Sequence, residues 1–398
     1  MSTGAPIHEV AAVFTRLGLT AFGGPAAHIA AMNDELVVRR GWLSGEEFAD
    51  LVGAANLIPG PNSTELAIHL GYRRAGWAGL LVAGSCFIVP AVLIVWAIAW
   101  SYVTWGARLE VQAMLQGMQP AVLAVVVQAI WRLKGSLVRT RLGQVLAALA
   151  FGGMLLGVSE LVLMVGALLV ALAVAVADRP TNAGPSRLAL LLAPAASAPN
   201  PIALSAGAVA VAGGTASRLS GAAIFLSFAK IGSVLFGSGY VLLTFLRGEF
   251  VTRLGVLSEA QLLDAIAVGQ VTPGPVFSAA TFVGFLLGGH AGAAAATVGI
   301  FLPAFVAVAL TAPLVSRLRE SPMLSRALDA VNAVTLALMT GVVLLMARSL
   351  VLSPWSLAIL GVASFLLLRT RLGALWVLSG GALAGLARLL LAGSVLTP

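Results

Sequence analysis

The stretch Ile58-Pro59-Gly60-Pro61-Asn62 places a Pro-Gly-Pro tripeptide between two apolar segments, and the tripeptide returns at Pro273-Gly274-Pro275. Proline lacks a backbone N–H and clashes with the preceding helical turn, so each tripeptide predicts an interrupted helix with backbone groups that have no intrahelical partner. In hydrocarbon, such groups are stable only where protein or a watery cavity satisfies them. A doubled interruption therefore predicts a doubled binding site inside a membrane protein.

The composition is that of a polytopic helical membrane protein. Of the 398 residues 60% are hydrophobic and 10% are charged, and the mean hydropathy is +1.02. One soluble core does not need so much apolar sequence. The 23 Lys and Arg residues give a net charge of +8. Because they are scattered over short loops and form no stripe, they indicate loop orientation in a membrane, and nucleic acid is not expected as a partner.

Metal, redox and cofactor sites are not expected. The single cysteine, Cys86, lies in an apolar segment and excludes an internal disulfide, a CxxC pair and a thiolate cluster. The four histidines, His8, His28, His69 and His290, are dispersed and lack the paired spacing of a zinc site. The sequence contains no Walker A motif, no dinucleotide-binding glycine pattern and no nucleophile elbow, so ATP is not the expected energy source.

The chain contains an internal duplication. Residues 14–64 align without a gap with residues 228–278, which lie 214 positions further on. Compositional bias pairs alanines and leucines by chance, but it does not readily pair polar residues in register. The polar identities are Glu35/Glu249, Arg39/Arg253, Ser44/Ser258 and Asp50/Asp264. We therefore predict a first transporter repeat at 1–177, a proline-rich linker at 178–220 and a second repeat at 221–398.

Each repeat is predicted to be all-α, with helices that break or re-enter at the Pro-Gly-Pro motifs. The segment 10–32 is broken by Phe22-Gly23-Gly24-Pro25, and Ser44 with Glu47 forms a capping box that Ser258 and Gln261 repeat. Gly60 is predicted as the N-cap of the helix that follows, with Pro61 as its first residue. Longer segments follow, giving about 10 to 13 membrane segments in all. They are 76–103, 110–131, 141–158, 160–177, 222–246, 258–289, 291–314, 327–350, 354–369 and 372–394.

Loop charges predict opposite orientations for the two repeats. In the first repeat the positive loops, at Arg73-Arg74 and 132–141, are expected in the cytoplasm. In the second repeat the excess of positive charge lies one membrane segment away from the equivalent loops, in the loops that contain Arg317 and Arg369. The pattern predicts inverted-topology repeats related by a pseudo-two-fold axis in the membrane plane.

Two topologies satisfy this inversion. If each repeat crosses an even number of times, the linker must itself cross, and 202–216 is its only apolar stretch. If the Pro-Gly-Pro hairpin is re-entrant and the segment before it crosses, each repeat crosses the membrane an odd number of times and the linker stays in the cytoplasm. We prefer the first.

Together these motifs resemble the chromate ion transporter family in its two-domain, long-chain form. The resemblance rests on Phe-Gly-Gly at 22–24, Pro-Gly-Pro at 59–61 and weaker copies at 236–239 and 273–275, and it covers essentially the whole chain. It implies a multi-pass protein of the bacterial inner membrane that exports chromate, a tetrahedral dianion that mimics sulfate. Because residues 236–239 read Phe-Gly-Ser-Gly, the second site is expected to be a degenerate partner of the first.

The helix starts at the two breaks are the expected anion sites. A helix beginning at Pro59-Gly60-Pro61 or at Pro273-Gly274-Pro275 exposes free N–H groups and the positive end of its dipole. Asn62, Ser63 and Thr64 would add donors in the first repeat. The alternative is ordinary capping, with Asn62 and Glu65 closing a box. Val276 and Phe277 stand in place of Asn62 and Ser63, so the two sites are expected to differ chemically.

Two further groups of residues are candidates for the substrate site. The Phe-Gly motifs, Phe22-Gly23-Gly24 and Phe236-Gly237, would allow the substrate close to the backbone, with tight helix packing as the alternative. Arg16 and Lys230 are equivalent cations within apolar segments, and a mid-membrane charge costs at least about 2.5–3.5 kcal/mol. We expect them to balance the dianion together, with snorkelling to the interface as the alternative.

Carboxylates near the breaks are candidates for ion coupling. Glu65 follows Pro61 closely, and Asp50 and Asp264 occupy matched places before the breaks. Intramembrane carboxylates often carry protons or cations, although Glu65 could instead be a structural cap. Glu35 with Arg39, and equally Glu249 with Arg253, has the spacing of an interfacial ion pair.

The function predicted is secondary efflux of chromate that gives chromate resistance, with no enzyme activity. A rival within the same class is uptake or exchange of sulfate or another oxyanion. A remote rival is a membrane-embedded enzyme, which the scarce histidines and single cysteine disfavour. The partners expected are chromate, sulfate as a competitor and membrane lipids; a homodimer is left open.

Overall fold

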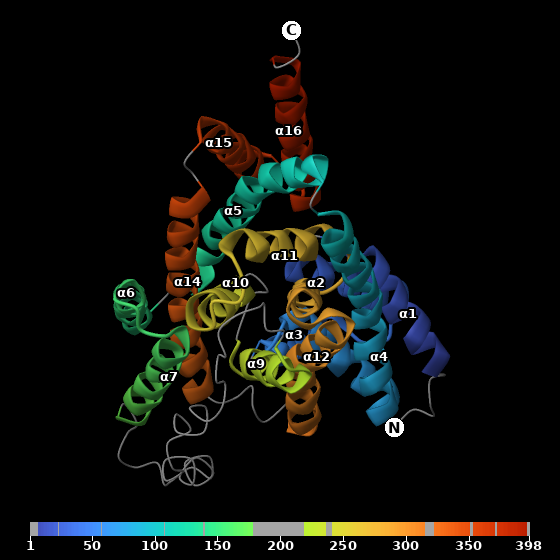
Figure 1. Cartoon of the computed structure of the whole chain (residues 1–398). Coiled ribbons are helices and arrows are strands. Elements are labelled where there is room, and N and C mark those ends of the chain that lie inside the picture. The colour runs from blue at the N-terminus through green and yellow to red at the C-terminus, as the bar shows by residue number, and fades with distance from the viewer. Residues whose placement is uncertain are drawn as a thin grey trace.

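The computed structural model describes residues 7–22, 24–56, 58–106, 108–137, 140–177, 219–235, 241–314, 322–350, 353–370 and 372–395. In these ranges every regular element is a helix (Figure 1). The first half contains α1 (Ile7–Thr20), α2 (Pro25–Asn33), the π-helix η1 (Asp34–Arg39), α3 (Gly45–Ala55), α4 (Asn62–Trp105), α5 (Leu109–Leu137), α6 (Arg141–Leu155) and α7 (Glu160–Ala177).

The second half repeats this order. It contains α9 (Gly221–Val234), α10 (Leu242–Leu246), the π-helix η5 (Arg247–Arg253), α11 (Glu259–Val271), the 3₁₀ turn η6 (Val276–Ser278), α12 (Ala279–Thr311), the 3₁₀ turn η7 (Ala312–Leu314), α14 (Pro322–Leu350), α15 (Pro354–Arg369) and α16 (Ala374–Val395). The predicted capping boxes at Ser44 and Ser258 are both present, and a π-helix follows α2 and α10 alike. The duplication in the sequence therefore has a counterpart in the order of helices.

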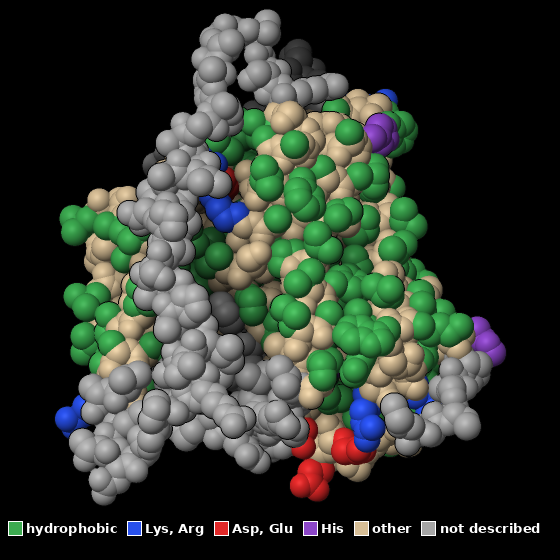
Figure 2. All heavy atoms as spheres, turned by 90° about the horizontal axis from the view of Figure 1, so that it is seen from below, with side chains coloured by type: hydrophobic (Ala, Val, Ile, Leu, Met, Phe, Trp, Pro, Cys, Tyr) green, Lys and Arg blue, Asp and Glu red, His purple; other side chains and the backbone are tan. Residues whose placement is uncertain are grey.

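Five helices among the described residues are long and apolar enough to cross a membrane. They are Asn62–Trp105, Leu109–Trp131, Val276–Thr311, Asp329–Arg348 and Ala374–Leu391. The face shown in Figure 2 is covered largely by apolar side chains. Large apolar residues such as Leu81, Leu302 and Leu310 lie exposed on these helices, as lipid-facing residues do. The all-α polytopic membrane class predicted from composition is confirmed.

Helices α4 and α12 each fold back on themselves at a matched reversal. In α4 the reversal has φ −140°, ψ 26° at Ala75 and φ 59°, ψ −146° at Gly76. In α12 the values are −147°, 17° at Gly288 and 60°, −146° at Gly289. Each helix thus has a short arm (62–74 or 279–287) beside a long arm (77–105 or 290–311). The 13-residue short arm of α4 is about 20 Å long, too short to cross about 30 Å of hydrocarbon.

The hairpins of the first half begin and end at the same end of the molecule. Glu47 near the start of α3 pairs with Arg73 at the end of the α4 short arm, 2.6 Å apart. Glu9 at the start of α1 pairs with Arg40 beyond η1, at 3.0 Å, and with Arg74, at 3.3 Å. Both α1–α2 and α3–short arm therefore form hairpins whose two ends lie close together.

The long arms of α4 and α12 run side by side in opposite directions. Trp96 Nε1 donates a 2.9 Å hydrogen bond to Nδ1 of His290, the residue directly after the α12 reversal. Trp96 itself lies about 20 residues, or about 30 Å, beyond the α4 reversal. Reciprocally, Tyr72 before the α4 reversal packs against the core cluster that contains Ala304 and Val308, far along α12. The two reversals thus lie at opposite ends of the paired arms.

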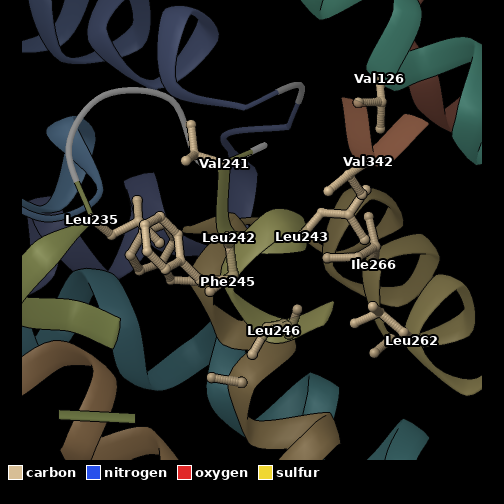
Figure 3. Close-up of a cluster of buried hydrophobic side chains, with 14 of the residues drawn as sticks. Val126, Leu235, Val241, Leu242, Leu243, Phe245, Leu246, Leu262, Ile266 and Val342 are labelled. Atoms are coloured by element: carbon tan, nitrogen blue, oxygen red, sulfur yellow. The ribbon is translucent and has the colours of Figure 1, made fainter. Parts of the chain in front are cut away.

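The remaining helices exchange partners between the halves. Helix α5 packs against α15 and α16, whereas α14 packs against α6 and α7 (Figure 1). The buried core crosses the same boundary: Val126 of α5 and Val342 of α14 gather with Leu243 of α10 and Ile266 of α11 (Figure 3). Residues 178–218 of the linker, which include the predicted crossing at 202–216, lie outside the described residues.

Candidate functional site

Each Pro-Gly-Pro break is hydrogen-bonded to the end of the first helix of the other half. The Gly60 N–H donates to the Leu235 carbonyl at 2.6 Å, and the Gly274 N–H donates to the Ala21 carbonyl at 3.0 Å. Gly60 and Gly274 are equivalent in the duplication, as are Ala21 and Leu235. The structure therefore brings both breaks to the helix ends at which the Phe-Gly motifs begin.

Glycine is needed at both breaks because of the backbone conformation. Gly60 has φ 139° and Gly274 has φ 86°, values that side chains rarely allow. A Cβ on Gly60 would collide with the Glu65 carboxyl group. A Cβ on Gly274 would lie 2.8 Å from Ala91 Cβ and 3.1 Å from the Gly18 carbonyl oxygen.

The Phe-Gly motifs are only partly within the described residues. Phe22 is 44% exposed, so its ring does not line a closed site. Gly24 has φ 82° and caps α2, which begins at Pro25. Gly23, Phe236 and Gly237 lie outside the described residues.

The capping expected at the start of α4 is wrong. Pro61, not Gly60, is the N-cap, and no side chain caps the helix. The Asn62 Nδ2 atom instead donates to Asn56 Oδ1 at 2.6 Å, so Asn62 and Glu65 close no box. Helix α4 thus begins without side-chain caps. The Thr64 N–H donates to the Pro61 carbonyl oxygen at 2.6 Å, so within the first turn the N–H groups of Asn62 and Ser63 are the ones that a ligand could meet.

Buried polar groups without partners gather at this helix start. Thr64 Oγ1 and both carboxyl oxygens of Glu65 are fully buried and have no hydrogen-bond partner. His28 of α2 is 1% exposed; its Nδ1 lies 3.1 Å from Ser63 Oγ and its Nε2 has no partner. Such groups are rare in proteins and suggest a ligand, water or proton. Hydroxyl and imidazole donors suit an oxyanion, whereas a carboxyl group suits a proton.

The equivalent turn of the second half is less polar. Val276 and Phe277 are buried apolar residues in the 3₁₀ turn that replaces the first turn of α4. Ser278, the equivalent of Thr64, is fully buried and its hydroxyl also lacks a partner. Sequence reasoning missed Ser278 and His28. The alignment of Thr64 with Ser278 could have identified the first, but nothing in the sequence pairs His28 with Ser63.

The two aspartates expected in coupling have different surroundings. Asp264 is 4% exposed and accepts hydrogen bonds from Tyr102 Oη, at 2.9 Å, and Gln119 Nε2, at 3.1 Å. Both donors belong to the first half, so Asp264 joins α11 to the opposite repeat. Asp50 is half-buried on α3. In the described part of the chain, no three His, Cys, Asp or Glu side chains are placed to hold a metal ion.

The equivalent cations Arg16 and Lys230 are each paired with the equivalent glutamate of their own half. Arg16 forms an ion pair with Glu35, and Lys230 Nζ lies 2.6 Å from Glu249 Oε2. The cations are about half exposed, at 52% and 46%, whereas both glutamates are 7% exposed. Neither cation is therefore an isolated buried charge.

Further arginines complete the two ion-pair clusters. Glu249 also pairs with Arg253, as predicted, but Glu35 pairs with Arg40 at 2.6 Å while Arg39 pairs with Asp34. The predicted Glu35–Arg39 pair is wrong because the π-helical turn brings Arg40, five residues on, to Glu35.

These contacts lower the pKa of both glutamates. Burial acts to raise the pKa of Glu35, but the hydrogen bond from Arg40 and the charges of Arg16 and Arg40 outweigh it. Burial likewise acts to raise the pKa of Glu249, and Arg253 and Lys230 outweigh it. Both carboxylates are therefore ionised at neutral pH and hold their cations.

Comparison with known proteins supplies the family. The chromate transporter family model matches residues 8–176 and 222–386, one segment in each half. The chain belongs to the chromate transporter family. A chromate transport protein of Cupriavidus metallidurans is 31% identical over 96% of this chain and 92% of its own length. One of Pseudomonas aeruginosa is 35% identical over 75% and 70%, respectively.

Family membership decides several expectations. A probable chromate transport protein of Synechococcus elongatus is 29% identical over 86% of the chain and 85% of its own length. No solved structure matches the chain. Because this family consists of transporters, the chain is a multi-pass transporter of the plasma membrane and not an enzyme. The remote alternative of a membrane-embedded enzyme is therefore wrong.

Proposed function

We propose that this protein exports chromate from the cytoplasm across the inner membrane by secondary transport and thereby confers chromate resistance. The observation that carries the proposal is the family match in both halves, together with relatives named for chromate transport. The unpartnered donors at the start of α4 fit a tetrahedral oxyanion.

The direction is supported by the energetics of a dianion. An interior-negative potential favours anion exit by about 2.3 kcal/mol per charge per 100 mV, hence about twice that for chromate. No ATP site is needed. Uniport down this potential, or exchange with protons, would each suffice.

The transport site is proposed at the junction of two inverted-topology repeats. The opposed long arms of α4 and α12 support the inversion, and the reciprocal hydrogen bonds of Gly60 and Gly274 support a shared central site. The substrate would meet the N–H groups after Pro61 and Pro275, with the hydroxyls of Ser63 and Thr64.

Arg16 and Lys230 are proposed to balance the charge of the bound dianion. Arg16 precedes Ala21 by five residues, or about 8 Å of helix, which its long side chain can reach across. Glu35 and Glu249 would hold the two cations when no substrate is bound. Binding would then exchange one anionic partner for another.

Glu65 is proposed as the proton carrier, with Asp50 and Asp264 in supporting coupling roles. An unpartnered carboxyl group in a fully buried place is stable when it holds a proton. Its position against Gly60 puts the proton beside the substrate site. A proton on Glu65 and a dianion at the helix start could therefore influence each other directly.

Uptake or exchange of sulfate is the rival function on the same scaffold. The deciding experiment expresses this chain in a chromate-sensitive, transport-deficient host and measures growth on chromate at varied sulfate. Export predicts resistance with lower cell-associated chromate at every sulfate level. Greater chromate sensitivity, relieved by sulfate, would favour uptake.

A further inference from the structure

We infer that His69 relays protons between Glu65 and the cytoplasmic end of the α4 short arm. The inference rests on the proposed function, in which Glu65 carries the coupling proton. It adds the route by which that proton leaves the membrane interior.

The route follows from spacing along one helix face. Glu65, His69 and Arg73 are separated by four residues each, so their side chains lie one above another on the short arm. Side chains at this spacing are neighbours, with Cβ atoms about 5–6 Å apart, which a direct contact or one water can bridge. Glu65 lies at the inner end, against Gly60, and Arg73 lies at the outer end, paired with Glu47.

The burial of His69 is not matched by a hydrogen bond at its Nε2 atom. His69 is 1% exposed, and its Nε2 atom has no hydrogen-bond partner. A buried imidazole nitrogen without a partner is costly, and apolar residues would pack the position as well. Two such groups, Glu65 and His69, one helical turn apart, form a chain of the kind that moves protons in transporters.

The other ionisable groups on the elements packed against the α4 short arm are mostly engaged elsewhere. Glu9 pairs with Arg74 and Arg40, Arg16 with Glu35, Glu47 with Arg73, Glu259 with Arg247, Asp264 with Tyr102 and Gln119, and His28 Nδ1 with Ser63; His8, Glu46, Asp50, Cys86 and His290 also lie on these elements. Tyr72 of the short arm packs its ring edge-on against Trp77. Among the described carboxyl and imidazole groups of the short arm, Glu65 and His69 are thus the ones with buried atoms that lack a partner.

The relay belongs to one repeat only. The residues equivalent to Glu65 and His69 are Ala279 and Val283, which are fully buried and cannot bind protons. The first-half reversal carries Arg73-Arg74, which indicates the cytoplasm. The relay thus serves the cytoplasmic side: Glu65 releases its O–H proton, one His69 ring nitrogen accepts it, and the other ring nitrogen gives up its proton to water of the cytoplasm, which leaves His69 neutral again.

The test uses the full chain in proteoliposomes and two assays. One measures chromate uptake driven by a pH gradient with the potential clamped, and the other measures chromate/chromate exchange at equal pH, which needs no net proton movement. For His69→Gln and His69→Asn we expect gradient-driven uptake to fall about 100-fold, the usual loss for a proton-transfer group. Exchange should stay close to the wild-type rate.

Two controls separate the outcomes. His290→Gln, on the α12 reversal, should match the wild type in both assays. Gradient-driven uptake at the wild-type rate in His69→Gln would overturn the relay, and so would equal loss of exchange, which would indicate a structural role. If wild-type uptake ignores the pH gradient, the proposed coupling itself fails. If wild-type uptake responds to the pH gradient and His69→Gln uptake does not, the result supports the relay as well as the proposed coupling.

Discussion

The backbone N–H of Gly60 donates a 2.6 Å hydrogen bond to the carbonyl oxygen of Leu235, the residue that ends the first helix of the opposite half. Gly274 makes the equivalent bond to Ala21. Each break in one half thus closes on a helix end in the other. A movement of one half against the other would therefore act on both breaks, as the proposed transport between inverted repeats needs.

Alanine at either break glycine should stop transport. Gly60→Ala and Gly274→Ala force a side chain into a positive-φ conformation and a crowded site, at a cost of about 1–3 kcal/mol each. We expect loss of chromate resistance while protein remains in the membrane. Gly45→Ala is the matched control, because a Cβ there meets nothing within 4 Å. Normal chromate export by both Gly60→Ala and Gly274→Ala would contradict a transport site at the two breaks.

The paired cations should be required for export. Arg16→Ala and Lys230→Ala are each expected to abolish chromate resistance at normal membrane expression, whereas Arg16→Lys should keep part of it because charge matters more than the planar fork. Glu35→Gln distinguishes a substrate contact from an anchoring ion pair. If Arg16 binds the substrate, this variant should retain chromate resistance although Arg16 has lost its ion-pair partner. If both alanine variants export chromate with the wild-type rate and half-saturation, the two cations are structural anchors and do not bind the substrate.

The Glu249 cluster should stabilise the fold down to acidic pH. Its pKa lies below the ordinary value of 4.5, so its contribution is fully present above that pH and is lost as the pH falls through the lower, folded value. Glu249→Gln should cost about 1–3 kcal/mol. In melting curves in detergent, the difference from wild type should be constant from pH 8 to pH 6 and should shrink only as the pH falls below 4.5. A difference that fades near neutral pH would argue against the ion pairs.

The opposed reversals make a topology prediction. In a Cys86→Ser background, cysteines at Ala75 and His290 should react with a membrane-impermeant reagent from opposite sides, since the reversals lie at opposite ends of the paired arms. Cysteines at Ala183 and Ser217 should also react from opposite sides if the linker crosses. Labelling of the first pair from one side would exclude inverted repeats.

Much of the fold was predictable because the residues that start or interrupt helices act on their immediate neighbours in sequence. Helix breaks at the prolines of 59–61 and the capping boxes at Ser44 and Ser258 depend only on neighbours in sequence. The duplication, a shift by 214 positions, can be read from the sequence directly. The reversals at Gly76 and Gly289 were expected as helix boundaries, but not as tight hairpins. A glycine in an apolar segment does not reveal whether the chain turns by a few degrees or folds back.

The site was less predictable because its contacts join distant elements. His28 and Ser63 lie 35 residues apart, and Asp264 is 162 residues from Tyr102. The ion pairs of Arg16 and Lys230 were missed because each cation meets a glutamate on another helical element, 19 residues further along the chain. Helical spacing of 3.6 residues assigned Glu35 to Arg39, whereas the wider π turn gives it Arg40.

Chromate uptake into everted membrane vesicles tests the central claim most directly. Everted vesicles expose the cytoplasmic face, so an exporter should accumulate chromate when respiration energises the membrane, and collapse of both the potential and the pH gradient should abolish accumulation. Gly60→Ala vesicles should accumulate none, while Gly45→Ala vesicles should match the wild type. Accumulation that survives the collapse of both gradients, or uptake that occurs only in right-side-out vesicles, would contradict secondary export.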